Sequence, residues 1–406
     1  MTKLLMLYFI SLFGCATSAN QTSVPDNVET GSVKDTTEVM KTGAENTELY
    51  LGQLKNKKVG FVVNQSSKIG NQHILDFMLS NGVKPTKIFA LEHGIRGTVA
   101  DGDHIKNGVD SITGSPIISL YGTNRKPTKE DMTGLDVIVF DIQDVGVRFY
   151  TYISSLQLIL ESGAENKVKV IVLDRPNPHA NYVAGPVLED KFKSFVGAFN
   201  IPVVYGMTIG ELAGMMVGER WINEAANCNY EVIKCTNYDR NKLYPLSAWP
   251  SPNLPNMRAV LLYPSLCFFE GTDVSVGRGT SKQFQIFGHP AFKDLYNFSF
   301  KPMPNVGSSS PPQMNVTCYG RDLSDLDPDM LFQKQKIDYS YLVEAFAATK
   351  KTGVELVTRA SHFDRLAGTE RLKNAVTSGK TIEEIEAMFS SEIEAFKTKR
   401  QKYLLY

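Results

Sequence analysis

The sequence lacks an excess of either charge, because 43 lysines and arginines balance 43 aspartates and glutamates among its 406 residues. A chain without net charge has no overall field that would draw it to nucleic acid or to an anionic membrane surface. Beyond its first residues it also lacks apolar runs long enough to cross a bilayer, since the longest, such as residues 168–173, have the length of a strand. These absences predict a soluble folded body that does not bind nucleic acid, and the chain length suits two domains.

Signatures of cofactor and metal binding are missing as well. Residues 59–63 (VGFVV) resemble a first strand, but they run into NQSS and not into the G-x-G-x-x-G turn of dinucleotide-binding proteins. The glycine-rich residues 271–279 lack the P-loop pattern, and the cysteines lack the spacing of a zinc site. We therefore predict no metal and no organic cofactor. Cys228 and Cys235 either close a small disulfide loop or remain thiols, and spacing alone does not decide between the two.

The first fifteen residues have the features of an export signal. Lys3 supplies a positive charge, residues 4–13 form a short apolar stretch, and the segment LFGC ends at Cys15. This pattern resembles the bacterial lipobox, in which the cysteine receives a lipid. We predict a signal peptide over residues 1–15, lipidation of Cys15, and a disordered tether over residues 16–48, whose composition is polar and aperiodic. The protein would then be exported and anchored through the lipid, facing the periplasm or the cell surface.

From residue 57 onward, apolar strand-like runs alternate with helix-like segments. Strands are predicted at residues 59–63, 87–92, 116–121, 135–142 and 168–174, and helices at 73–81 and 150–162. Strands that are apolar on both faces and separated by helices predict a parallel sheet covered on both sides. We expect a Rossmann-like three-layer α/β domain over residues 49–250. The proline-rich residues 249–255 (WPSPNLP) then lead to a smaller α/β or α+β domain over 251–406, with helices at 339–350 and 381–399.

Polar residues stand where several of these strands end, which is where open α/β sheets bind ligands. One of them, Glu92, lies in the segment LEHGIRG, whose glycines free the backbone to aim a carboxyl group into a cleft. Such a group can act as a general acid if burial or a nearby negative charge raises its pKa. The alternative is that Glu92 pairs with Arg96 and only fastens the loop.

Two further segments carry groups suited to a sugar site. Residues 141–152 combine two carboxylates, an arginine and two tyrosines, although paired carboxylates could also hold magnesium. Residues 268–280 add Glu270, Asp273 and Arg278, which could face the first segment across an interdomain cleft. This placement suits glycoside hydrolysis, in which a protonated acid and a second group act on opposite sides of the scissile bond. Trp249 and Tyr205 are either stacking platforms for a sugar or ordinary core aromatics.

Seven blocks of sequence together resemble the NamZ-type exo-β-N-acetylmuramidases, from about residue 50 to the end of the chain. They are LEHGIRG, FDIQDVGVRFYTY, LDRPNP, GPVLE, PVVYGMTIGEL, WPSPNLPN and YPSLCFFEGTDVSVGRGT. The resemblance implies a Rossmann-like domain joined to a smaller one, with the active site between them. It also implies release of N-acetylmuramic acid from the non-reducing end of peptidoglycan fragments, in cell-wall turnover or recycling, without a cofactor.

The resemblance further implies that Glu92 is the proton donor. Its catalytic partner stays open among Glu270, Asp273, Asp144 and the 2-acetamido group of the substrate itself. Arg148 and Arg278 are the hypothesised partners of the lactyl carboxylate. The predicted substrate-binding residues are Asn64, His93, Arg96, Asp141, Asp144, Arg148, Tyr150 and Arg278. The alternative function is a surface lipoprotein that binds muropeptides or sugars without cleaving them.

Overall fold

The computed structural model describes residues 39–96 and 107–406. The predicted signal peptide, Cys15 and most of the predicted tether lie outside this range. Residues 41–48, which were predicted to belong to the disordered tether, are folded. The 3-10 helix η1 (Gly43–Glu45) is capped by Thr42 and is followed by η2 (Thr47–Leu49). Gly43 lies so close to the sheet that a Cβ at this position would be 2.6 Å from the Asp174 nitrogen. The polar composition of this segment did not indicate such close packing.

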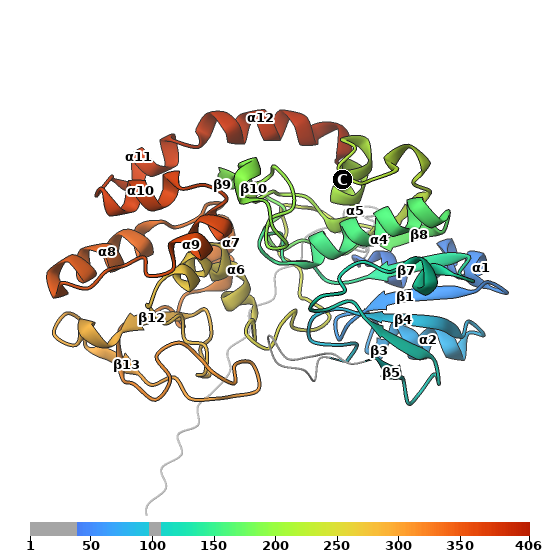
Figure 1. Ribbon diagram of the computed structural model, residues 1–406, viewed down its shortest axis with the longest axis horizontal. Helices are drawn as coiled ribbons and strands as arrows, with labels where there is room; N and C mark the ends of the chain where they lie inside the picture. The colour runs from blue at the N-terminus through green and yellow to red at the C-terminus, as the bar shows by residue number, and fades with distance from the viewer. Residues whose placement is uncertain (1–38, 97–106) are drawn as a thin grey trace, which may run out of the picture. The chain divides into compact units, whose positions relative to one another are not determined.

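In the described part of the chain, seven strands form the main sheet (Figure 1), in the order β11-β8-β7-β1-β4-β6-β5. All neighbours are parallel except β5 and β6. The chain therefore steps outward from β1 to one side and then returns to the other, and this confirms the predicted Rossmann-like layout. The strands are β1 (Val59–Val63), β4 (Pro85–Ala90), β5 (Gly108–Val109), β6 (Pro116–Ser119), β7 (Val137–Asp141), β8 (Lys169–Leu173) and β11 (Tyr230–Ile233).

Successive residues of these strands point to opposite faces of the sheet, and both faces are buried. One face packs on α2 (Ile74–Ser80) and the other on α4 (Tyr152–Asn166) and α5 (Ile209–Gly218). The first core contains Phe61, Val139 and Ile171, and the second contains Val62, Phe140 and Val172. The predicted helices at 73–81 and 150–162 are thus confirmed as α2 and α4. Shorter elements of this part are α1 (Leu51–Leu54), β2 (Lys68–Ile69), β3 (Gln72–His73), α3 (Lys129–Met132), β9 (Ala184–Val187) and β10 (Pro202–Val204).

The second domain is α+β. Its three strands form an antiparallel sheet in the order β12-β14-β13, within the described residues. The predicted helix at 339–350 is confirmed as α8, whereas the predicted helix at 381–399 is interrupted at the buried Phe389 and forms α11 and α12. The elements are α6 (Met257–Leu266), η5 (Cys267–Gly271), β12 (Ile286–His289), β13 (Phe298–Phe300), β14 (Cys318–Asp322), α7 (Pro328–Gln333), α8 (Ser340–Thr352), α9 (Ala360–Ala367), α10 (Arg371–Thr377), α11 (Ile382–Ala387) and α12 (Ser390–Arg400).

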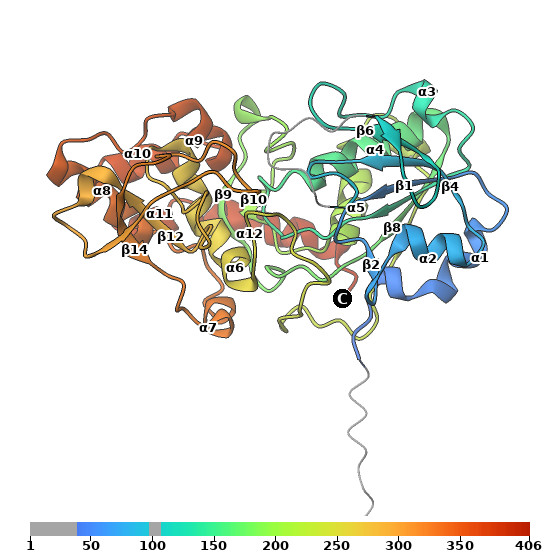
Figure 2. The same ribbon diagram turned by 90° about the horizontal axis from the view of Figure 1, so that it is seen from below.

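The end of the chain returns to the first domain. Helix α12 packs on β9, and Figures 1 and 2 show it running from the neighbourhood of α11 toward α5. Beyond it, the Tyr406 hydroxyl donates to an Asp174 carboxylate oxygen at 2.7 Å, and the Leu405 nitrogen donates to Glu211 at 2.8 Å. The two domains are therefore joined both by the connection at residues 249–255 and by this returning segment.

Candidate active site

A cavity of about 160 Å³ lies where the carboxyl end of β4 and the start of α4 meet residues of the connection and of the second domain. The first domain contributes Glu92, His93, Phe149, Tyr150, Thr151, Tyr152 and Val196 to its lining. The connection and the second domain contribute Ser251, Asn253, Leu254, Tyr263, Arg278 and Phe284. Of the residues predicted from sequence, Glu92, His93, Tyr150 and Arg278 are thus brought together here.

Glu92 reaches the cavity because the chain reverses sharply just beyond β4. His93 and Gly94 both adopt the left-handed backbone conformation, with φ of 68° and 73°, which is strained for a histidine. The Glu92 carboxylate accepts from the Tyr121 hydroxyl at 3.0 Å and from the Thr151 hydroxyl at 3.4 Å. Hydroxyl groups from the segment after β6 and from the residue that precedes α4 therefore orient the Glu92 carboxyl group, which follows β4.

Arg96 does not pair with Glu92, so the alternative of a loop staple between these two residues is wrong. Its guanidinium instead lies 3.1 Å from Asp76 and 3.2 Å from Asp110. Arg96 fastens the loop after β4 to α2 and to the segment after β5, and it does not line the cavity. Its role is to hold the loop that carries Glu92.

Aromatic rings form a continuous wall of the cavity. The Tyr150 ring meets the Tyr152 ring edge-on at 5.0 Å, and the Tyr263 ring meets Phe149 at 5.1 Å and Phe284 at 4.8 Å in the same manner. Aromatic faces combined with hydroxyl groups suit the alternating apolar and polar surface of a sugar. Tyr263 and Phe284 escaped the sequence reasoning because isolated aromatic residues in apolar segments are usually core.

Arg278 supplies a positive charge to the lining. Its Nε donates to Glu270 Oε1 at 2.6 Å, and its guanidinium lies 5.2 Å from the centre of the Phe284 ring. Glu270 is thus held next to the cavity through Arg278. Asp273 points elsewhere, since it pairs with Arg359 at 3.4 Å and its side chain is 47% exposed. Asp273 is not among the lining residues.

Arg148 was predicted to meet an anionic substrate, but the structure uses it in the interior. Its guanidinium is completely buried and donates to four backbone carbonyls at 2.6–3.0 Å. Burial lowers the pKa of Arg148 to about 9. Because its acceptors come from both domains, Arg148 ties the domains together. The four acceptors are Pro186, Ile201, Leu366 and Ala367.

Asn64, Asp141 and Asp144 also lie outside the cavity, although they lie at the ends of β1 and β7 as predicted. The Asn64 side-chain oxygen accepts from the Ser66 nitrogen at 2.9 Å, which closes a turn. Asp141 forms a buried two-pronged pair with Arg175 at 2.6 and 2.9 Å. Asp144 accepts from Tyr205 and from the Gly146 nitrogen. These contacts are internal to the fold.

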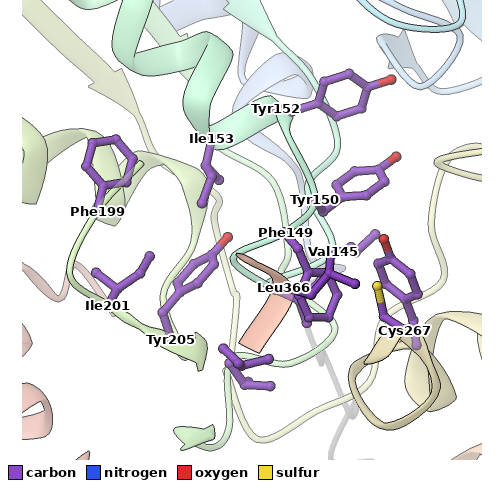
Figure 3. Close-up of a cluster of buried hydrophobic side chains, with 14 of the residues drawn as sticks. Val145, Phe149, Tyr150, Tyr152, Ile153, Phe199, Ile201, Tyr205, Cys267 and Leu366 are labelled. Atoms are coloured by element: carbon purple, nitrogen blue, oxygen red, sulfur yellow. The ribbon is translucent and has the colours of Figure 1, made fainter. Parts of the chain in front are cut away.

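The crevice at this part of the sheet edge is filled by the chain itself. The Ser247 hydroxyl donates to the Ser66 carbonyl at 2.9 Å, and the Gln65 side chain donates to the Pro250 carbonyl at 3.0 Å. Tyr205, a candidate sugar platform, is fully buried and bonded to Asp144. Figure 3 shows Tyr205 beside Ile201, apart from Tyr150 and Tyr152.

The remaining predictions concern cysteines, metals and membrane spans. Cys228 and Cys235 are both free thiols, and the Cys235 sulfur contacts the Asp174 carbonyl at 3.3 Å. Over residues 39–96 and 107–406, no cluster of three or more His, Cys, Asp and Glu side chains is arranged to hold a metal ion. In the same residues, no helix combines the length and apolarity that a membrane span requires.

Comparison with known proteins connects this site to a family. Residues 59–258 match the N-terminal domain of exo-β-N-acetylmuramidase NamZ, and residues 261–406 match its C-terminal domain. The chain is 34% identical over 375 residues to the peptidoglycan β-N-acetylmuramidase NamZ of Bacillus subtilis, covering 88% of this chain and 89% of that protein.

Two crystal structures of DUF1343 family proteins from Bacteroides fragilis have the same fold. One is 42% identical, with a TM-score of 0.82, and the match covers 91% of this chain and 99% of that one. The other is 29% identical, with a TM-score of 0.77, and the match covers 90% and 99%.

Proposed function

Since the chain belongs to the exo-β-N-acetylmuramidase NamZ family, we propose that it releases N-acetylmuramic acid from the non-reducing end of peptidoglycan fragments. The protein is a peptidoglycan-processing glycosidase. The observation that carries the proposal is the position of Glu92, whose carboxyl group is held by Tyr121 and Thr151 in a cavity walled by tyrosines. We further propose a role in cell-wall turnover or recycling.

Glu92 acts in this proposal as the general acid. In the described lining it is the one carboxyl side chain, because Asp144 is buried elsewhere and Asp273 pairs with Arg359. This favours attack by the 2-acetamido oxygen of the substrate on C1, while the Glu92 proton passes to the departing glycosidic oxygen. Water then attacks C1 of the cyclic intermediate and gives up a proton to the Glu92 carboxylate. Two displacements predict retention of configuration at C1.

Proton NMR of the first-formed sugar tests this route. The β-anomer should appear first and then mutarotate to the equilibrium mixture. An initial α-anomer would exclude attack by the acetamido group, because a single displacement by water inverts C1.

Arg278 binds the lactyl carboxylate in this scheme, since a guanidinium matches a carboxylate with two parallel hydrogen bonds. Arg278→Met should lower kcat/KM for an aryl β-N-acetylmuraminide by one to two orders of magnitude, because a hydrogen bond to a charged group contributes about 1.5–3 kcal/mol. The corresponding glucosaminide, which has no lactyl group, is the control substrate. An equal loss on both substrates would assign Arg278 a purely structural role.

Hydrolysis itself is tested with the purified protein and the disaccharide of N-acetylmuramic acid and N-acetylglucosamine. Chromatography should detect both free sugars. The alternative is a surface protein that binds the disaccharide without cleaving it. Saturable binding in calorimetry without any release of sugar would support that alternative and overturn the enzymatic proposal.

Export and lipid anchoring are proposed from the first fifteen residues, where Lys3, an apolar stretch and the segment LFGC precede and include Cys15. A fatty-acid label supplied to expressing cells should appear on the protein. Cys15→Ala should abolish the label and move the protein from the membrane fraction to the soluble fraction. Equal labelling of the variant would contradict lipidation at Cys15.

A further inference from the structure

The connection at residues 249–255 presents a tryptophan on a fixed backbone. The Gln65 side chain donates to the Trp249 carbonyl at 3.2 Å and to the Pro250 carbonyl at 3.0 Å. The Tyr150 hydroxyl donates to the same Pro250 carbonyl at 2.7 Å. The backbone around Trp249 is therefore held from two sides of the first domain.

The Trp249 side chain is nevertheless 46% exposed. Trp221, the other tryptophan of the sequence, is partly buried and stacks on Phe199 at 5.1 Å. Exposing an indole forgoes the large burial energy that an aromatic ring gains in a core. An exposed indole on an anchored, proline-rich segment is pre-organised for contact with a ligand, because little backbone freedom is lost on binding.

Trp249 stands next to the cavity along the chain. Ser251, two residues further on, belongs to the lining, and the Pro250 carbonyl contacts Tyr150 of the aromatic wall. Consecutive Cα atoms are about 3.8 Å apart, so the Trp249 backbone lies within roughly 8 Å of the lining. The Trp249 backbone therefore lies near the site that contains Glu92, although Trp249 is not itself one of the lining residues.

The size of the cavity limits which part of a substrate can lie inside it and which part must lie at its mouth. A volume of about 160 Å³ is well below the roughly 300–1,000 Å³ of pockets that enclose a drug-sized ligand. If the terminal sugar occupies the cavity, the next sugar of the glycan must lie at its mouth. An exo-acting enzyme needs a surface there that holds the departing sugar while Glu92 protonates the glycosidic oxygen.

We propose that Trp249 is the stacking platform for the sugar on the leaving-group side, an N-acetylglucosamine unit. This proposal rests on the proposed function, which places the terminal N-acetylmuramic acid in the cavity and the next sugar outside it. The apolar face of this pyranose ring packs on the indole, and the anchored backbone keeps the indole in place. Trp249 thereby favours substrates that have a second sugar over those with a small leaving group.

The first test compares substrates in Trp249→Ala, Trp249→Phe and the wild type. For the natural disaccharide, kcat/KM should fall about tenfold in Trp249→Ala, and Trp249→Phe should recover most of it. For N-acetylmuraminyl fluoride, whose leaving group is a single atom, the three proteins should be equal. Met330→Ala, which removes another exposed apolar side chain (68% exposed, on α7), is the control and should behave as wild type on both substrates.

The second test does not depend on catalysis. The disaccharide of N-acetylglucosamine, which has no lactyl group, should change the tryptophan fluorescence of the wild type and not that of Trp249→Phe. A fluorescence change without hydrolysis of any muraminide would contradict the proposed function and still support sugar binding at Trp249. Equal losses on the disaccharide and the fluoride, or a loss confined to substrates that carry a peptide stem, would overturn the platform.

Discussion

Carboxylates at the ends of different strands of the main sheet have different roles in this protein. After β7 and β8, Asp141 is buried against Arg175, and Asp174 accepts from Thr208, Gly210 and Tyr406 at 2.7–2.8 Å. After β4, Glu92 is oriented by two hydroxyl groups and lines a cavity. The first two carboxylates stabilise the fold, and the third is presented to a ligand.

The end of a strand fixes the position of a carboxylate but does not by itself make that carboxylate accessible to a ligand. The returning end of the chain and residues 247–250 cover the edge near β1, β7 and β8. At β4 the chain turns away through His93 and Gly94, and the second domain leaves a cavity there. Substitutions at the two kinds of site should therefore separate activity from stability.

Replacing Glu92, the carboxyl group that lines the cavity, should have the largest effect on activity. Glu92→Gln removes the proton donor and keeps the shape of the side chain, so turnover of the disaccharide should fall by about 10²–10⁴-fold. The melting temperature should stay close to the wild-type value, because the glutamine side chain keeps an oxygen that can accept from the Tyr121 and Thr151 hydroxyls. Initial rates and circular dichroism measure the two quantities, and a variant with more than a tenth of normal activity would move the acid elsewhere.

Replacing the buried carboxylate of Asp141 should instead lower stability and leave activity unchanged. Asp141→Asn leaves the buried Arg175 guanidinium without its counter-charge, which should lower the free energy of unfolding by ~3–5 kcal/mol. Activity per folded molecule should persist, since neither residue lines the cavity. Urea denaturation measures the loss. The double variant Asp141→Asn/Arg175→Met is the control and should recover part of the stability, because it also removes the buried positive charge of Arg175.

The comparison also separates what the sequence can predict from what it cannot. The strands were predictable, since apolar runs are local properties, and Glu92 was indicated by the family resemblance more than by the composition of LEHGIRG. Arg148 was not, because its four carbonyl acceptors lie 38 to 219 residues away along the chain. The cavity wall at Tyr263 and Asn253 depends likewise on how the second domain folds back. Residue type indicated which groups could bind a sugar, and only long-range packing decided which of them reach the cavity.

Replacing Asp144 should change the free energy of unfolding by an intermediate amount that depends on pH. Burial raises the pKa of Asp144 to about 6 from an ordinary value of 3.8, so between these values the folded protein binds a proton that the unfolded chain has released. This contribution to stability is complete below the unfolded pKa and is lost as the pH rises through 6. Asp144→Asn stays neutral and can still accept from Tyr205, so it should be more stable than wild type at pH 7.5, by up to about 3 kcal/mol.

At pH 4 the two proteins should unfold at nearly the same urea concentration, because Asp144 is then largely protonated in the folded state. The measurement is the difference between the unfolding free energies of variant and wild type at the two pH values. A difference that does not grow with pH would show that Asp144 does not titrate as a buried, partly desolvated carboxyl group.

Asp273 should give the smallest effect, although sequence reasoning placed it with Glu270 as a catalytic candidate. Its side chain is 47% exposed and its partner Arg359 is 46% exposed, and exposed ion pairs contribute only about 0–1 kcal/mol. Asp273→Asn should therefore keep kcat/KM for the disaccharide within about twofold of wild type. Glu270→Gln is the matched comparison, because it weakens the 2.6 Å contact that holds Arg278 at the cavity and should raise KM. A collapse of kcat in Asp273→Asn would mean that this carboxylate swings into the site when substrate binds.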